Sequence, residues 1–233
     1  AVLSSHFRPV SHYFRQNFSQ VTNPPIDSLR ENKVMSLKTR FGNLGNILDF
    51  DNLTEENIYV LDSPVLTNSQ FKKFKKFFAK KVKVIDCTFD IEKTLKERIE
   101  SIREEAETAV RQGSTCLVLS DKNISNKKAS IPSILTVGAV HSHLVKHGLR
   151  GYCSLNVECS DAMDTHSFAI LIGVGATTVN PYLAIDSIYQ RFEKKLFGKS
   201  DFETCVNKFK KSIDAGLLKI MSKMGISVIS SYR

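Results

Sequence analysis

Three acidic side chains stand at or directly after short apolar runs that are typical of buried strands. These residues are Asp86, Asp121 and Glu158, and Ser120 immediately precedes Asp121. Because the carboxyl ends of parallel strands meet at one edge of a sheet, this placement fits a general acid–base site. Asp and Ser after a strand are also ordinary helix caps, so a structural role is the alternative.

Three histidines lie close together near the middle of the chain. His143 and His147 are four residues apart on a predicted helix, the spacing of the two histidines in the H-E-x-x-H zinc motif. Leu144 stands where that motif has its glutamate, and His141 points to nearly the opposite helix face. We therefore expect no metal site here, and interpret the histidines as polar side chains at a helix end that faces another domain.

A strongly basic segment at residues 71–83 holds seven lysines and no acid. The whole chain has a net charge of +9, so the rest carries only +2. Four phenylalanines, at positions 71, 74, 77 and 78, fall on one face of a helix there. The segment is either a module that binds phosphates or an anionic surface, or an ordinary crossover helix with Phe inward and Lys outward.

Two further motifs carry little chemistry. Gly173-x-Gly175 resembles the start of a dinucleotide fingerprint, but the third glycine position is Thr178, so we interpret the pair as a tight turn after a helix. Cys153 and Cys159 face the same side of a predicted strand, and we expect both in the core. No nucleophile elbow or P-loop is present in the sequence.

Strand and helix patterns alternate from residue 57 onward. The expected strands are residues 58–61, 82–85, 115–119, 152–158, 177–180 and 226–230. The expected helices are residues 69–79, from Thr88 or Asp90 to Gln112, 132–147, 163–172, 182–192 and 202–224. This order predicts an α/β fold with a mostly parallel sheet or an incomplete (β/α) barrel, flanked by helices. A complete (β/α) barrel has eight strands, and only six are expected here.

The N-terminal part reads differently. Residues 1–56 are rich in turn formers and predict an extended arm, with a short helix from Asp27 or Ser28 to Leu37, packed on the main domain at residues 57–233. We treat the two as one structural unit overall.

Composition excludes several classes of protein. With 42% hydrophobic and 24% charged residues in 233, the chain is globular and neither disordered nor collagen-like. Five scattered Cys and no signal-peptide layout predict a cytoplasmic protein. The longest apolar runs are too short to span a bilayer, and the localised charge argues against nucleic acid as a partner. The missing initiator Met suggests a segment processed or cut from a longer chain.

Several stretches, read in order, resemble the central domain of the large chain of glutamate synthase from about Leu3 to Arg233. They are residues 21–31 with 34–37, 119–121, 131–135 with 137–141, 166–169 with 172–176, 179–184, and 216–227 with 231–233. The chain departs from the family pattern at Lys122, Ser142 and Thr165, where the family often has Arg, His and His.

The resemblance implies a multidomain enzyme that converts glutamine and 2-oxoglutarate to two glutamates. An amidotransferase domain releases ammonia, and a tunnel carries it to an FMN-binding barrel that receives electrons through an iron–sulfur cluster. The central domain joins these parts, has no catalytic residues and resembles a reduced barrel. We thus expect no metal or cofactor in this fragment, and partners in the same chain plus a small NADPH-binding subunit or ferredoxin.

By the same resemblance, Thr22 and Asn23 lie near the mouth of the ammonia tunnel. Two prolines follow them and hold backbone carbonyls outward, as acceptors that ammonia needs. The alternative is a rigid arm that never contacts ammonia. Two other functions also stay open: an autonomous α/β enzyme that uses Asp86, Asp121 and Glu158, and a basic binding module at residues 71–83.

Overall fold

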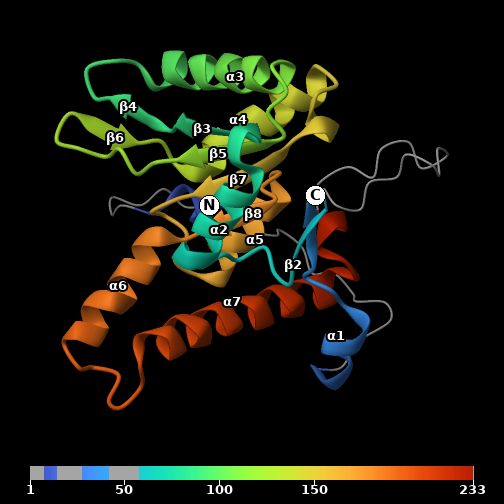
Figure 1. Cartoon of the computed structure of the whole chain (residues 1–233), viewed down its shortest axis with the longest axis vertical. Helices are drawn as coiled ribbons and strands as arrows, with labels where there is room; N and C mark the ends of the chain where they lie inside the picture. Colours follow the sequence, from blue (N-terminus) through green and yellow to red (C-terminus); the bar gives the residue numbers. More distant parts are fainter. Residues whose placement is uncertain (1–7, 15–27, 42–57, 233) are drawn as a thin grey trace.

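A parallel four-stranded sheet forms the centre of the computed structural model, which describes residues 8–14, 28–41 and 58–232 (Figure 1). Its strands, in spatial order, are β3 (Val82–Asp86), β5 (Cys116–Ser120), β7 (Ser154–Glu158) and β8 (Thr178–Asn180). The crossover helices between them are α3 (Leu95–Arg111), α4 (Ser133–Lys146) and α5 (Thr165–Gly173). Spatial order equals chain order without reversal, as in a (β/α) barrel, which confirms the predicted fold class.

Helices cover both faces of this sheet, which explains why all five residues of β5 are buried. Leu117 and Leu119 pack into the large core on the side of α3, α4 and α5. Cys116 and Val118 point the other way, into a second core made with α2 (Asn68–Phe78). Helix α2 crosses in front of the strands in Figure 1, so it occupies the face that a closed barrel would turn inward.

Two long helices complete the body. They are α6 (Tyr182–Glu193) and α7 (Phe202–Met224), and the second runs along the lower side of the molecule in Figure 1. Asp201 caps the start of α7 by accepting a hydrogen bond from the backbone N–H of Thr204, and Gly225 ends the helix with φ 71°. These bounds confirm the prediction for residues 202–224.

The start of α3 differs from the prediction. Thr94, and not Thr88 or Asp90, caps this helix. The earlier residues form β4 (Thr88–Asp90), which pairs antiparallel with β6 (Lys128–Ser130). The backbone hydrogen-bonding groups at residues 88–90 pair with a strand that lies thirty-eight or more residues later in the chain. The preference of Thr and Asp for helix N-caps therefore predicted the wrong start of this helix.

The last predicted strand, residues 226–230, was also wrong. Val228 makes a single parallel bridge to Ser36, and a 3₁₀ turn at Ile229–Ser231 follows. The same contact explains why α1 (Ser28–Val34) ends before Leu37: the backbone of Ser36 bonds to Ser227 and Ile229 instead of continuing the helix.

The described parts of the predicted arm pack on the main body. Strand β1 (Thr39–Phe41) pairs antiparallel with β2 (Tyr59–Leu61), so residues 58–61 belong to this small sheet and not to the parallel one. Glu31 accepts a hydrogen bond from Lys219 of α7 at 3.1 Å. The N-terminal turn η1 (Val10–Tyr13) contacts α5, where Ser11 O lies 2.9 Å from His166 Nε2. The boundary between residues 56 and 57 stays a prediction.

Candidate functional site

The ends of the four parallel strands form one row of polar residues. The sheet register aligns Asp86 with Ser120, Ser120 with Glu158, and Glu158 with Asn180. Because side chains alternate along a strand, this row lies on the same face as Val118, under α2. Asp121 extends the edge by one residue. The sheet therefore does bring the three predicted carboxylates to one edge.

Glu158 is held by groups of its own chain. Its side chain is 5% exposed, and Ser120 Oγ donates to Oε2 at 2.8 Å. Lys122 Nζ lies 2.9 Å from Oε1, and Lys75 Nζ of α2 lies 3.7 Å from the same oxygen. Two cations thus neutralise this carboxylate, and Lys122 also lies 5.0 Å from the ring centre of Tyr182.

Asp121 belongs to a separate network. It is 2% exposed, and its Oδ2 accepts hydrogen bonds from Ser160 Oγ at 2.6 Å, Ser160 N at 3.0 Å and Ser130 Oγ at 3.0 Å. Burial, together with the nearby charge of Asp121, raises the pKa of the Tyr182 hydroxyl. The carboxylate therefore ties the end of β6 and the loop after β7 to the start of α6.

Asp86 caps the turn between β3 and β4. Its Oδ1 accepts from the Thr88 N–H at 2.9 Å and the Thr88 hydroxyl at 2.7 Å, and Asn123 donates to Oδ2 at 3.1 Å. Burial raises the pKa of Asp86, but these hydrogen bonds and the charge of Lys128 outweigh it, so the pKa lies below 3.8. An ionised, hydrogen-bonded Asp is a good cap and a weak base at neutral pH.

The histidines separate into two environments. His141 Nδ1 accepts from Arg150, whose guanidinium also donates to the carbonyls of Cys153 and Gly175. His143 and His147 instead meet Glu107 of α3, which the sequence analysis did not single out. The pKa of the Glu107 carboxyl is lowered by hydrogen bonds from Arg111 and His143. In the sequence, Glu107 lies four residues after Arg103 and four before Arg111, a spacing that places the three charged side chains on one helix face. This spacing was the one signal for the contacts around Glu107.

The cysteines are core residues, as predicted for Cys153 and Cys159, which are 8% and 1% exposed. Burial raises the pKa of the Cys87 and Cys116 thiols to about 12. Neutral thiols of this kind are poor nucleophiles and poor metal ligands. Gly173 ends α5 and Gly175 lies in the tight turn to β8, also as predicted.

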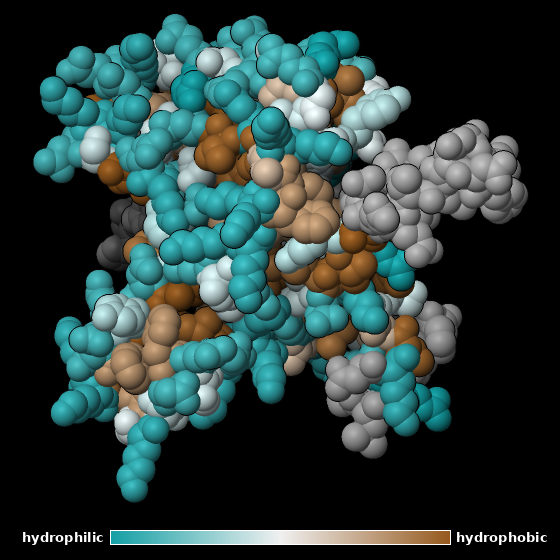
Figure 2. Space-filling view, in the orientation of Figure 1, coloured by the Kyte–Doolittle hydropathy of each residue, from teal (hydrophilic) through white to brown (hydrophobic). Residues whose placement is uncertain are grey.

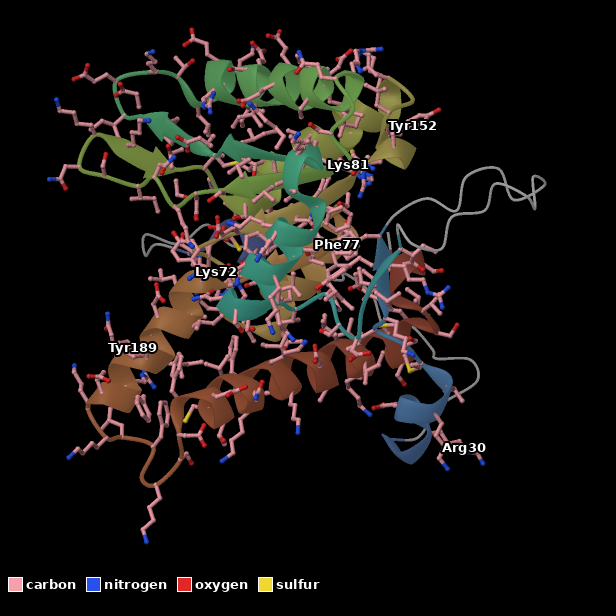
Figure 3. All side chains as sticks on the ribbon, viewed as in Figure 1. Arg30, Lys72, Phe77, Lys81, Tyr152 and Tyr189 are labelled. Atoms are coloured by element: carbon pink, nitrogen blue, oxygen red, sulfur yellow. The ribbon has the colours of Figure 1, made fainter. Side chains whose placement is uncertain are left out.

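Most lysines of α2 are exposed, whereas Lys75 reaches the edge of the sheet. Phe71 and Phe74 are buried, whereas Lys72, Phe77 and Lys81 lie on the outer side of the segment (Figure 3). Ion pairs engage Lys75 with Glu158 and Lys83 with Glu105. The burial of Phe71 and Phe74 and the exposure of most lysines agree with the structural interpretation of residues 71–83, although Phe77 is exposed. Helix α2 connects the antiparallel strand β2 to the parallel strand β3.

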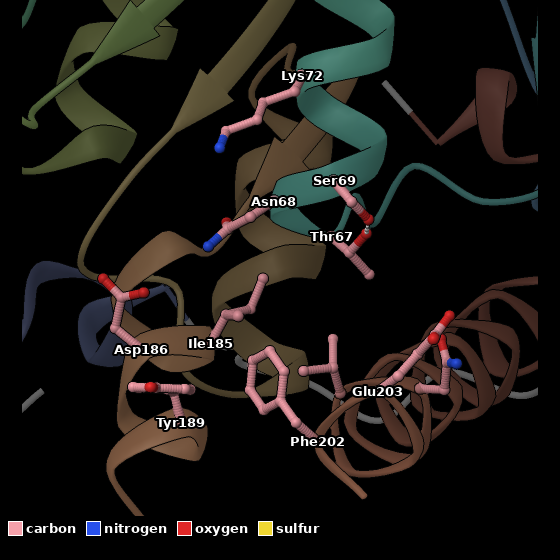
Figure 4. Close-up of a pocket in the computed structure, with 11 residues that line it drawn as sticks. Thr67, Asn68, Ser69, Lys72, Ile185, Asp186, Tyr189, Phe202 and Glu203 are labelled. Atoms are coloured by element: carbon pink, nitrogen blue, oxygen red, sulfur yellow. Dashed lines mark hydrogen bonds between the residues drawn. The ribbon is translucent and has the colours of Figure 1, made fainter.

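An open hollow of about 620 Å³ lies between the start of α2 and helices α6 and α7 (Figure 4). Ile185, Tyr189 and Phe202 give it an apolar floor, and Asn68 and Lys72 project over it from α2. Figure 2 shows hydrophobic residues gathered over this region of α6 and α7, in contrast to the hydrophilic surface of α3. Lys72 of the predicted basic segment lines this hollow, whereas Asp86, Asp121 and Glu158 do not.

Thr22 and Asn23 lie outside the described residues, so their proposed place near a tunnel stays a prediction. Within the described part of the chain, no helix is both long and apolar enough to cross a membrane.

These features define an α/β domain with a barrel-like parallel sheet whose polar edge is filled by its own side chains. The sequence matches the family model described as "Glutamate synthase central domain" over residues 1–233, and the chain belongs to this family.

Full-length relatives support the assignment. The chain is 54% identical to the glutamate synthase [NADPH] large chain of Azospirillum brasilense, covering 100% of this chain and 16% of the relative. It is 42% identical to the NADPH large chain of Bacillus subtilis and 41% identical to the chloroplastic ferredoxin-dependent enzyme of Spinacia oleracea, covering 100% of this chain and 15% of each relative. The chain therefore spans about one sixth of the length of these relatives.

Solved structures with a similar arrangement include a mutant flavocytochrome b2 with benzoylformate, at 18% identity and a TM-score of 0.46. That match covers 72% of this chain and 37% of the other. A mandelate oxidase mutant with the monooxide FMN adduct matches at 14% identity and a TM-score of 0.44, covering 56% of this chain and 37% of the other.

Proposed function

We propose that this chain is a non-catalytic connecting domain of a glutamate synthase that converts glutamine, 2-oxoglutarate and a reductant to two glutamates. In this proposal it holds the amidotransferase and FMN-binding domains of the same polypeptide in place and helps to form the ammonia tunnel. The family match over the whole chain supports it, as do relatives about six times longer.

The observation that carries the non-catalytic part is the occupied carboxyl edge of the sheet. Glu158 and Asp121, the best placed carboxylates, are 4% and 2% exposed and bonded to Ser120, Lys122 and Ser160. An acid or base must reach its substrate within hydrogen-bond distance, which these groups do not offer.

The same edge does not fit a flavin. A flavin phosphate needs uncommitted basic or backbone donors at the strand ends, but Lys75 and Lys122 pair with Glu158 and α2 covers the row. We therefore assign FMN and the iron–sulfur cluster to other parts of the polypeptide.

In our proposal, other parts of the enzyme determine which reductant it uses. Relatives named for NADPH and for ferredoxin both match along the whole chain, at 54% and 41% identity. A small NADPH-binding subunit or ferredoxin would thus be recognised by other domains. Cytoplasmic localisation belongs to the proposal too, and the relative in spinach is chloroplastic. Membrane and nucleic acid have no place in it.

Thr22 and Asn23 remain our candidates for the tunnel mouth and the contact between domains. The physical support is the rigid backbone that Pro24 and Pro25 impose on the residues before them.

The proposal is tested by expressing the 233-residue chain alone and beside the whole enzyme. The chain alone is expected to be colourless, to hydrolyse no glutamine and to form no glutamate, whereas the whole enzyme does both reactions and shows flavin absorbance. Yellow flavin absorbance or turnover in the purified chain would contradict a non-catalytic role.

A further inference from the structure

The packed helices α3 and α4 bring one acidic and two imidazole side chains together on the side of the sheet opposite α2. Glu107 comes from α3, and His143 and His147 come from successive turns at the end of α4. One ligand atom of each lies within 4.8 Å of the other two. We propose that Glu107, His143 and His147 form a site for a divalent transition-metal ion, with Zn²⁺ the best match.

The distances are those of a site that needs only side-chain adjustment. His143 Nε2 lies 2.6 Å from Glu107 Oε2, and with one ring nitrogen of His147 the three ligand atoms lie within 4.8 Å of one another. Ligand atoms about 2 Å from a tetrahedral zinc ion lie about 3.3 Å apart. The His143–Glu107 separation is shorter than this value, so the two side chains would rotate apart to admit an ion, with the ring of His147 within reach.

The neighbours of His147 and Glu107 already orient them. His147 Nδ1 lies 2.8 Å from the carbonyl of His143, an acceptor that places the proton on Nδ1 and leaves Nε2 with a free lone pair. A backbone carbonyl at this position is a common outer partner of metal-bound histidine. Arg111 donates to Glu107 Oε1 at 2.8 Å and leaves Oε2 for the ion.

An ion can reach the site from solvent. The side chain of His143 is 10% exposed, that of Glu107 is 22% exposed, and that of His147 is 35% exposed. His143 therefore lies on the buried side of the site, and the side near His147 is open to a water molecule as the fourth ligand. Two imidazoles, a carboxylate and water form a donor set that suits Zn²⁺.

Arg103 opposes metal binding. Its Nε lies 3.3 Å from His143 Nδ1, and because guanidinium only donates, His143 carries its proton on Nε2 and donates it to Glu107. Zinc on Nε2 requires this proton to move through solvent to Nδ1, where it faces the N–H of Arg103. Arg103 must then swing away, so removing it should strengthen binding.

The experiment measures zinc in the whole protein that carries this chain, by equilibrium dialysis against buffered Zn²⁺ and elemental analysis. We expect the wild type to bind one zinc ion per chain at this site. In His147→Gln and in Glu107→Gln, the zinc affinity of the site should fall at least ~10-fold, so that either variant holds up to one zinc per chain less. Arg103→Gln should bind ~10-fold more tightly, because the competing donor is gone.

Glu104→Gln is the matched control, since Glu104 is exposed on the same helix and should leave zinc binding unchanged. Zinc should also raise the unfolding temperature of the wild type and of Glu104→Gln, but not that of His147→Gln. Equal zinc content in wild type and His147→Gln would overturn the proposal. His147 is partly exposed, so its variant keeps the test valid even if Glu107→Gln fails to fold.

Discussion

Replacing Phe74 with Ala is expected to destabilise the domain by about 4 kcal/mol, since it leaves a cavity in a fully enclosed site. Phe74 is 0% exposed, and its ring centre lies 4.9 Å from that of Phe41 and 5.0 Å from that of Phe78. The side chain fills the core between α2 and the β5 residues Cys116 and Val118. Urea unfolding of the 233-residue chain measures the loss.

Phe77→Ala is the matched control on the same helix. Phe77 is 49% exposed and touches Tyr59 at the rim of this cluster, with 4.8 Å between ring centres. Its loss should cost at most ~1 kcal/mol. Equal losses for the two variants would show that α2 does not bury one face against the sheet.

Gly175→Ala is expected to cost about 3 kcal/mol, from backbone strain and from a clash in a packed turn. Gly175 has φ +122°, and a Cβ atom there would lie 2.4 Å from both Cγ and Nδ1 of His141. The ring cannot move away freely, because Arg150 donates to its Nδ1 at 3.1 Å and to the Gly175 carbonyl at 2.9 Å. The substitution therefore disturbs α4, β7 and the α5–β8 turn together.

Gly173→Ala is the control two residues earlier. Its backbone is helical, and a Cβ atom would meet only the Tyr232 ring, at 3.2 Å. The better helix propensity of Ala offsets this contact, so the change in unfolding free energy should stay within ~1 kcal/mol. If Gly175→Ala were as mild as Gly173→Ala, the tight turn would not be essential.

Local signals predicted the elements that are stabilised locally. The predicted bounds of α7, residues 202–224, match the helix, whose two ends are capped by Asp201 and Gly225. The apolar run at residues 115–119 predicted a buried parallel strand, and β5 (Cys116–Ser120) lies one residue later. Gly113 lies two residues after α3, close to the predicted end of this helix.

Elements that depend on distant partners were not predicted. The β4–β6 pair joins Thr88 to Ser130, and the bridge from Ser36 to Val228 spans most of the chain. Three-residue ladders have too little pattern of their own to show in a sequence, and their formation overrode the capping preferences of Thr88 and Asp90.

The candidate site was predicted only in part. Since strand ends meet, the row of Asp86, Glu158 and their neighbours could be foreseen from the sequence. The groups that occupy it could not, because Ser160 and Lys75 reach the edge from a loop and from α2. Glu107 was missed for the same reason: it lies 36 residues before His143 and meets it only through helix packing.

The most direct test of the central claim measures glutamine-dependent glutamate formation in the whole enzyme with Glu158→Gln and Asp86→Asn. Both changes keep the side-chain shape and remove the carboxylate at the strand ends. If these groups only stabilise the fold, kcat per folded molecule should stay within about threefold of wild type, whereas loss of a general acid or base costs ~100-fold or more. A fall of that size in a folded, flavin-loaded variant would contradict a connecting role and make this edge catalytic.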